Sequence, residues 1–208
     1  MPQYPLWKAD ALTAALRYGF RMRTAPALLV AALVVGTLAG CVPDDEPVRP
    51  APSPTSSPIF ESDEEALAAA VEAYGAYLAV SDSVLNDGGQ APERLLAVAT
   101  EDLYQKAAEG FESFATKGWR GTGSTTFDSS VLQSYFSDAV PGEQIIAIYV
   151  CVDLSGVDVV DGDGASVVSP SRVNRSPYEV GFTAVEAGDP SLLVSSDAPW
   201  DGDDFCVG

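Results

Sequence analysis

The sequence contains no histidine among its 208 residues. This absence excludes a Ser-His-Asp triad and an imidazole general base, and it removes the commonest side-chain ligand of metal ions. Carboxylates, tyrosine hydroxyls and lysine amines remain as groups for acid–base chemistry. We predict no catalytic residue, no cofactor and no metal site.

Basic residues are scarce, with 11 Lys and Arg against 30 Asp and Glu. From Cys41 onward the chain holds 7 of the basic and 29 of the acidic residues. A surface this negative repels phosphate backbones, so we predict that nucleic acid is not a partner. The acidic bias serves solubility, or it attracts a basic partner or a cation.

Apolar runs long enough to span a membrane, which takes about 20 residues, are also missing. Residues 25–38 are apolar but shorter, and two arginines precede them, as is typical of a signal-peptide core. The run leads directly into Leu38-Ala39-Gly40-Cys41, which is an aliphatic residue, two small residues and a cysteine.

Leu38-Ala39-Gly40-Cys41 resembles the lipobox of bacterial lipoproteins, and the chain is similar in style to actinobacterial lipoproteins with a tethered domain. The resemblance implies that diacylglycerol is attached to the Cys41 sulfur and that residues 1–40 are removed as a signal peptide. The implied location is the extracytoplasmic face of the cell membrane, and the membrane is then a partner through the lipid. Ordinary signal cleavage and an uncleaved anchor helix are the alternatives. Met22 is an alternative start, which would leave residues 1–21 outside the protein.

Residues 42–60 contain six prolines with serine and threonine between them. Proline removes backbone donors and favours extended polyproline II structure. We predict that residues 41–60 comprise the lipidated cysteine and a disordered tether, and that residues 61–208 form a single domain. A proline-rich docking motif is the alternative interpretation of the tether.

The first part of the domain carries signals for three helices. Ser62 and Glu65 form a capping box before the first helix, which stops at Asn86–Gly89. A shorter helix begins at Pro92, and a third runs from the cap Thr100 to Gly118.

From residue 119 the apolar periodicity changes from helical spacing to two, which is typical of strands. Residues 145–152 are apolar on both faces and are predicted to form the central strand. We predict the other strands at residues 119–127, continuing past a bulge to 131–136, at 178–185 and at 192–195. Helices followed by strands indicate an α+β domain in which N-terminal helices pack on a curved antiparallel sheet.

This element order resembles the NTF2-like (cystatin-like) cone shared by SnoaL-type cyclases and ketosteroid isomerases, over about residues 62–200. The resemblance implies a cavity, whose candidate lining residues are Tyr74, Tyr104, Trp119, Tyr149 and Phe182. Aromatic residues in such positions are more often part of a plain core. No acidic residue is clearly embedded in an apolar run on the cavity side, and Asp153 is the nearest candidate acid.

Cys151 and Cys206 are the two cysteines after Cys41. An even pair in an exported domain predicts one disulfide bond, which would fix the C-terminal segment to the central strand. Two separately buried thiols are the alternative.

Two acidic turns, residues 161–164 and 201–204, raise the question of calcium binding. The EF-hand pattern fails from Asp161 onward, because the fifth position is Ala165 and the twelfth is Arg172. Aspartate and glycine are also the usual residues of hairpin turns, and we interpret residues 161–164 as a hairpin tip.

The sequence therefore favours a lipid-anchored, non-catalytic domain that binds a protein partner or a small apolar ligand. A cavity enzyme of the isomerase or cyclase type is the alternative from another class. An accessory subunit of a cell-envelope complex is a third.

Overall fold

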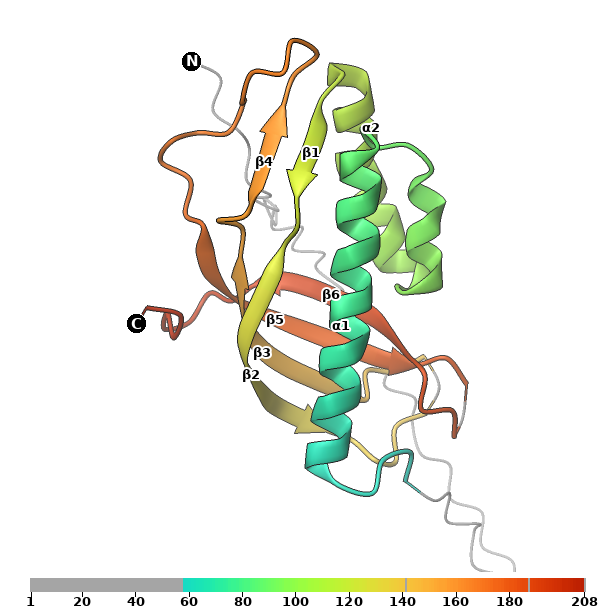
Figure 1. Ribbon diagram of the computed structural model, residues 1–208. Coiled ribbons are helices and arrows are strands. Elements are labelled where there is room, and N and C mark those ends of the chain that lie inside the picture. Colours follow the sequence, from blue (N-terminus) through green and yellow to red (C-terminus); the bar gives the residue numbers. More distant parts are fainter. Residues whose placement is uncertain (1–57, 141, 187, 208) are drawn as a thin grey trace, which may run out of the picture. The chain divides into compact units, whose positions relative to one another are not determined.

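The computed structural model describes residues 58–140, 142–186 and 188–207, which all belong to one compact unit (Figure 1). The predicted signal segment, the lipobox with Cys41 and the tether as far as residue 57 lie outside this part of the chain. Within the described residues, no helix has the length and apolar character needed to cross a membrane.

Three helices come first, as predicted: α1 (Asp63–Asn86), the 3₁₀ helix η1 (Pro92–Ala97) and α2 (Glu101–Lys117). The Ser62 hydroxyl accepts a hydrogen bond from the Glu65 amide at 3.2 Å, and the Glu65 carboxylate reaches back to the Glu61 amide. Local capping chemistry thus fixes the start of α1.

Four strands form an antiparallel sheet in the order β2 (Thr126–Tyr135), β3 (Ile146–Asp153), β5 (Arg175–Ala184) and β6 (Leu192–Pro199). β3 lies between two neighbours, which confirms its prediction as the central strand. A register shift between Asp128 and Val131 confirms the predicted bulge in β2. The α+β class, with helices before an antiparallel sheet, is therefore correct.

The prediction of one strand through residues 119–127 is wrong. β1 (Arg120–Gly123) leaves the main sheet and pairs with β4 (Val157–Val160), a strand that we did not predict. Gly123 has a φ of 83°, and a Cβ there would lie 1.9 Å from the Gly156 carbonyl oxygen. The turn at this position therefore requires glycine, because a side chain would collide with the backbone next to β4.

Helix α1 crosses one face of the four-stranded sheet (Figure 1). Alternate residues of β3 face this helix, and they are joined in the core by apolar side chains of β5, β6 and α1. The main members of this core are Ile146, Ile148, Val150, Val152, Val180, Phe182, Val194, Ala66, Ala70, Tyr74 and Leu78.

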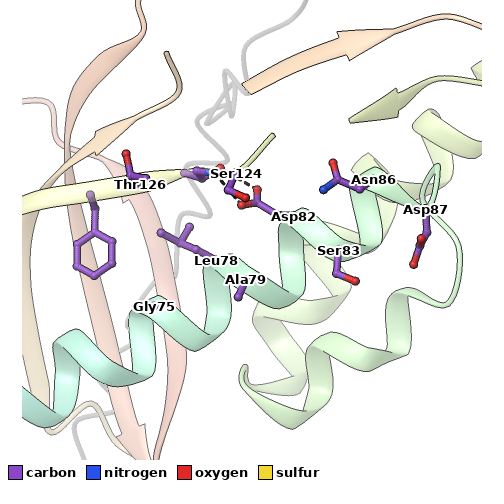
Figure 2. A pocket seen from close by; sticks show the side chains of 11 residues that line it. Gly75, Leu78, Ala79, Asp82, Ser83, Asn86, Asp87, Ser124 and Thr126 are labelled. Atoms are coloured by element: carbon purple, nitrogen blue, oxygen red, sulfur yellow. Dashed lines mark hydrogen bonds between the residues drawn. The ribbon is translucent and has the colours of Figure 1, made fainter. Parts of the chain in front are cut away.

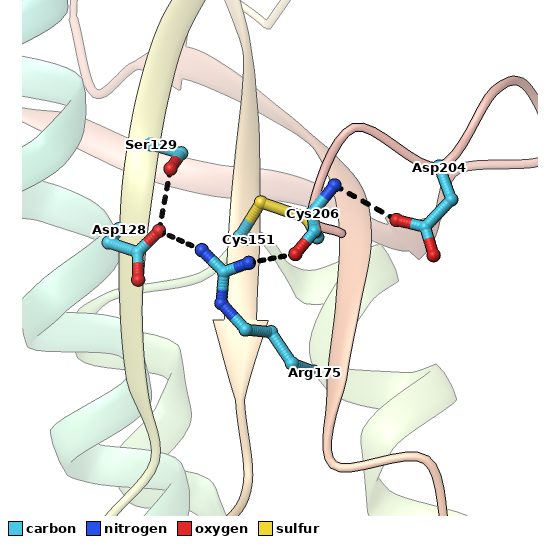
Figure 3. The surroundings of a disulfide bond; sticks show 6 residues. All are labelled: Asp128, Ser129, Cys151, Arg175, Asp204 and Cys206. Atoms are coloured by element: carbon cyan, nitrogen blue, oxygen red, sulfur yellow. Dashed lines mark hydrogen bonds and ion pairs between the residues drawn. A yellow bond between two sulfur atoms is a disulfide. The ribbon is translucent and has the colours of Figure 1, made fainter. Parts of the chain in front are cut away.

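The C-terminal segment lies against the opposite face of the sheet at Cys151 (Figure 3). The predicted disulfide joins Cys151 of β3 to Cys206. Arg175 donates hydrogen bonds to the Cys206 carbonyl and to the Asp128 carboxylate. Closing a loop of 55 residues contributes about 4 kcal/mol in the chain-entropy view.

Candidate functional site

The five aromatic residues predicted to line a cavity do not face a common space. Tyr74 and Phe182 are fully buried in the helix-facing core, and Tyr104 packs against its margin. Trp119 lies beside α2, where its ring contacts Phe114 at 5.9 Å between centroids. Trp119 therefore packs on α2, apart from the core that contains Tyr74 and Phe182.

Tyr149 lies on the opposite face of the sheet. Its ring packs on Trp200 and Phe205, at 4.8 and 5.8 Å between centroids, and its hydroxyl accepts a hydrogen bond from Gln133. Strand alternation explains why Tyr149 faces away from the helices, because it immediately follows Ile148, which faces them. Tyr149 therefore stabilises the docked C-terminal segment rather than a cavity.

Asp153, the candidate acid, is the last residue of β3, directly before a turn. Its carboxylate accepts a hydrogen bond from the Ser155 amide at 2.7 Å, and this bond lowers the pKa of Asp153. Asp153 is thus a polar residue at the end of β3 whose carboxylate stabilises the turn that follows.

A different acid, Asp197 of β6, is partly buried at the margin of the helix-facing core. Tyr74 donates a hydrogen bond from its hydroxyl to Asp197 at 3.1 Å, and the Tyr77 ring stacks on Tyr74. Burial raises the pKa of Asp197 to about 6, against the opposing effect of the Tyr74 hydrogen bond. Burial likewise raises the pKa of both tyrosines.

Sequence alternation could not place Asp197. Val194 faces the helices, so strict alternation would put Ser196 in the core and Asp197 outside. A register shift between Gly181 and Phe182 instead aligns Gly181 with Ser196 and Phe182 with Val194, which leaves one extra residue in β6. This bulge moves Asp197 to the helix-facing side, opposite Val180.

An open groove of about 530 Å³ lies between α1 and the segment that joins β1 to β2 (Figure 2). One end of the groove is apolar and the other is polar, with hydroxyl, amide and carboxylate groups. Its lining residues are Gly75, Leu78, Ala79, Asp82, Ser83, Asn86, Asp87, Ser124, Thr125, Thr126 and Phe127. Neither Tyr74 nor Asp197 is among them.

The walls of the groove are held together by Asp82, a residue that is 9% exposed. Its two carboxylate oxygens accept hydrogen bonds from the Thr125 amide at 2.7 Å and the Thr125 hydroxyl at 2.8 Å. Asn86 adds a bond from its side-chain amide to the Gly123 carbonyl. These contacts fix the β1–β2 segment on α1, so the groove is formed before any ligand arrives.

Arg94 forms an ion pair with Asp87 at the rim of the groove but no hydrogen bond with Asp82. Its guanidinium forms an ion pair with Asp87 at 2.8 Å and donates to the Ser83 hydroxyl at 2.9 Å. Both hydrogen bonds that reach Asp82 within the described residues come from the neutral Thr125. The charge of Asp82 therefore has no basic side chain as a hydrogen-bond partner there.

Comparison with protein-family models, with curated proteins and with solved structures finds no match. The site must therefore be interpreted from its own geometry.

In the acidic turn at residues 161–164, the Asp161 carboxylate is hydrogen-bonded by nearby backbone amides. One oxygen of Asp161 accepts hydrogen bonds from the amides of Asp163 and Ala165, at 3.0 and 2.9 Å. Among the described residues, no group of three or more potential ligand side chains is arranged to hold a metal ion. The turn geometry thus accounts for the aspartate at its first position.

Proposed function

We propose that this chain is a lipid-anchored lipoprotein of the extracytoplasmic membrane face, whose domain binds a ligand or protein partner without catalysis. The observation that carries this proposal is the pairing of cysteines. Of the three in the chain, Cys151 and Cys206 are joined to each other, and Cys41 is left for the lipid. A structural disulfide is typical of exported domains, which supports the same compartment that the lipobox implies.

The groove beside α1 supports the binding role. Its walls are preformed, and it combines an apolar end with a few polar groups, as ligand sites commonly do. The carboxylate of Asp82 is occupied by Thr125, so it is badly placed to act as a general acid or base. These features support recognition rather than turnover.

The finer assignment of the fold to the NTF2-like class is part of the same proposal. It is supported by the order of three helices followed by a bulged antiparallel sheet. The separate β1–β4 ribbon is a departure from the single curved sheet that we expected.

A cavity enzyme of the isomerase or cyclase type is the second candidate, because Asp197 and Tyr74 form a partly buried acid–hydroxyl pair. Such chemistry requires substrate access to this pair. An accessory role in a cell-envelope complex agrees with the anchor as well, and capture of a partner from detergent-solubilised membranes would favour it.

Fractionation of cells that express Cys41→Ser protein tests the anchor. We expect the wild type in the lipid fraction, and the variant either released or unprocessed, with the melting temperature of its domain unchanged. A variant that is processed and kept in the membrane like the wild type would show that the anchor is wrong.

A further inference from the structure

The face of the four-stranded sheet that lies away from α1 carries a patch of partly exposed aromatic rings. Tyr149 packs on Trp200 and Phe205, at 4.8 and 5.8 Å between ring centroids. Phe205 is 42% exposed, and Tyr149 and Trp200 are half-buried. Val131, which pairs with Tyr149 from β2, is 58% exposed. These four residues form an apolar surface, the outer aromatic patch, that is in part open to solvent.

Two contacts hold the rings of the patch in place. The disulfide at Cys206 fixes the neighbouring Phe205 against the sheet (Figure 3). A Cβ on Gly202 would lie 2.3 Å from Nε1 of Trp200, so this glycine lets the chain pass close to the indole ring. The patch is therefore preformed for a ligand that packs on aromatic rings.

The charge around the patch restricts its occupant. Residues 201–204, between Trp200 and Phe205, contain three aspartates. The whole chain from Cys41 onward is strongly acidic as well, so a second copy would bring like charges together at this face. An uncharged segment with apolar residues is favoured instead.

One such segment directly precedes the domain. Residues 51–57 read APSPTSS and carry no charge, whereas residues 44–46 read DDE. Proline favours the extended polyproline II conformation, and proline-rich segments dock on aromatic side chains because little conformational entropy is lost. The chain thus contains a segment whose chemistry matches the patch.

Residues 51–57 are also long enough to reach the patch. They lead to Phe60, whose ring contacts Tyr135 and whose amide and carbonyl are both hydrogen-bonded to the Tyr135 hydroxyl. Tyr135 lies in the edge strand β2 opposite Ile146, and Tyr149 follows Ile146 by three residues, about 10 Å along β3. Seven residues of polyproline II span about 20 Å, which leaves enough length to pass around the edge of the sheet.

We propose that residues 51–57 dock on the outer aromatic patch of the same molecule, with Pro52 and Pro54 against the exposed rings. Because the segment and the patch belong to one chain, the effective concentration is about millimolar and a weak contact is sufficient. Docking closes this face of the sheet to proline-rich segments of other proteins until the tether is displaced. The inference goes beyond the proposed function, since it requires neither the lipid nor a partner.

Fluorine NMR of the full chain in detergent, labelled with 5-fluorotryptophan, tests this proposal. The chain holds three tryptophans, Trp7, Trp119 and Trp200, and Trp200→Phe assigns the signal of the patch. Pro52→Gly combined with Pro54→Gly should shift the Trp200 signal by more than its linewidth, because the contacts of both prolines are lost. The signal of Trp119, whose ring packs on α2, should not move.

Pro43→Gly combined with Pro47→Gly is the matched control, since it removes two prolines from the same tether outside residues 51–57. This variant should leave the Trp200 signal unchanged.

A nitroxide label gives a second measurement that depends on distance. Attached to Ser53→Cys in a Cys41→Ser background, it should broaden the Trp200 signal more than the Trp119 signal.

A Trp200 signal that is unchanged in the Pro52 and Pro54 variant, or no preferential broadening by the label, would overturn the proposal and leave the patch to another protein. An equal shift in the Pro43 and Pro47 control would overturn it as well. Effects that disappear on dilution would assign the patch to a second copy instead. None of these results bears on the anchor, which the Cys41→Ser fractionation tests separately.

Discussion

Asp82 and Asp197 both lie close to α1, but their surroundings differ. Asp82 is in the wall of an open groove and receives two hydrogen bonds from Thr125. Asp197 belongs to β6 at the edge of the sheet and accepts a hydrogen bond from Tyr74, and burial raises its pKa to about 6. Burial alone therefore does not mark a functional acid, since access and hydrogen-bond partners decide what a carboxylate can do.

The largest expected effect comes from Asp197. Because its pKa rises from about 3.8 in the unfolded chain to about 6 in the folded protein, the folded state binds the proton more tightly. Its contribution to stability is therefore full below about pH 4 and is lost as the pH rises through 6, by about 3 kcal/mol.

Asp197→Asn should remove this loss, since the amide oxygen still accepts from Tyr74. Urea unfolding from pH 4 to 8 should show the variant gaining stability relative to the wild type as the pH rises. Other aspartates titrate in both proteins, so the difference between the two isolates Asp197. A difference that does not vary with pH would mean that Asp197 is not buried as described.

Asp82→Ala should cost about 2 kcal/mol of unfolding free energy, because the amide and hydroxyl of Thr125 both lose their acceptor. Asp82→Asn should cost less, since one acceptor remains. Chemical denaturation of the two variants and the wild type measures the difference in unfolding free energy. Equal losses in both would indicate that the charge of Asp82, rather than its hydrogen bonds, holds the β1–β2 segment.

Replacement of Arg94 by methionine should have the smallest effect, under about 1 kcal/mol, because the Arg94–Asp87 pair is largely exposed to solvent. The loss should shrink further in high salt. Thermal unfolding at low and high ionic strength is sufficient to measure it. A larger, salt-independent loss would indicate that the bonds from Arg94 to Ser83 and the nearby carbonyls dominate.

Local signals in the sequence predicted much of the fold. Thr100 and Gly118 bound α2 as expected, because capping depends on neighbouring residues alone. The continuous apolar run at residues 145–152 identified the central strand. The pairing of Cys151 with Cys206 followed from the even number of cysteines in a domain that we predicted to be exported.

Features that depend on distant parts of the chain could not be predicted in the same way. The turn at Gly123 reflects the approach of Gly156, and the position of Asp197 reflects a bulge opposite Gly181. The groove arises because Gly75 and Phe127 meet across two elements. A glycine in a helix and an aspartate in a strand carry no sign of these partners in sequence.

Mass spectrometry of the intact protein extracted from membranes tests the central claim most directly. We expect a mature chain that begins at Cys41, carries a diacylglyceryl group on that residue and retains the Cys151–Cys206 disulfide. A chain that retains the residues before Cys41, or one that carries no lipid there, would contradict it.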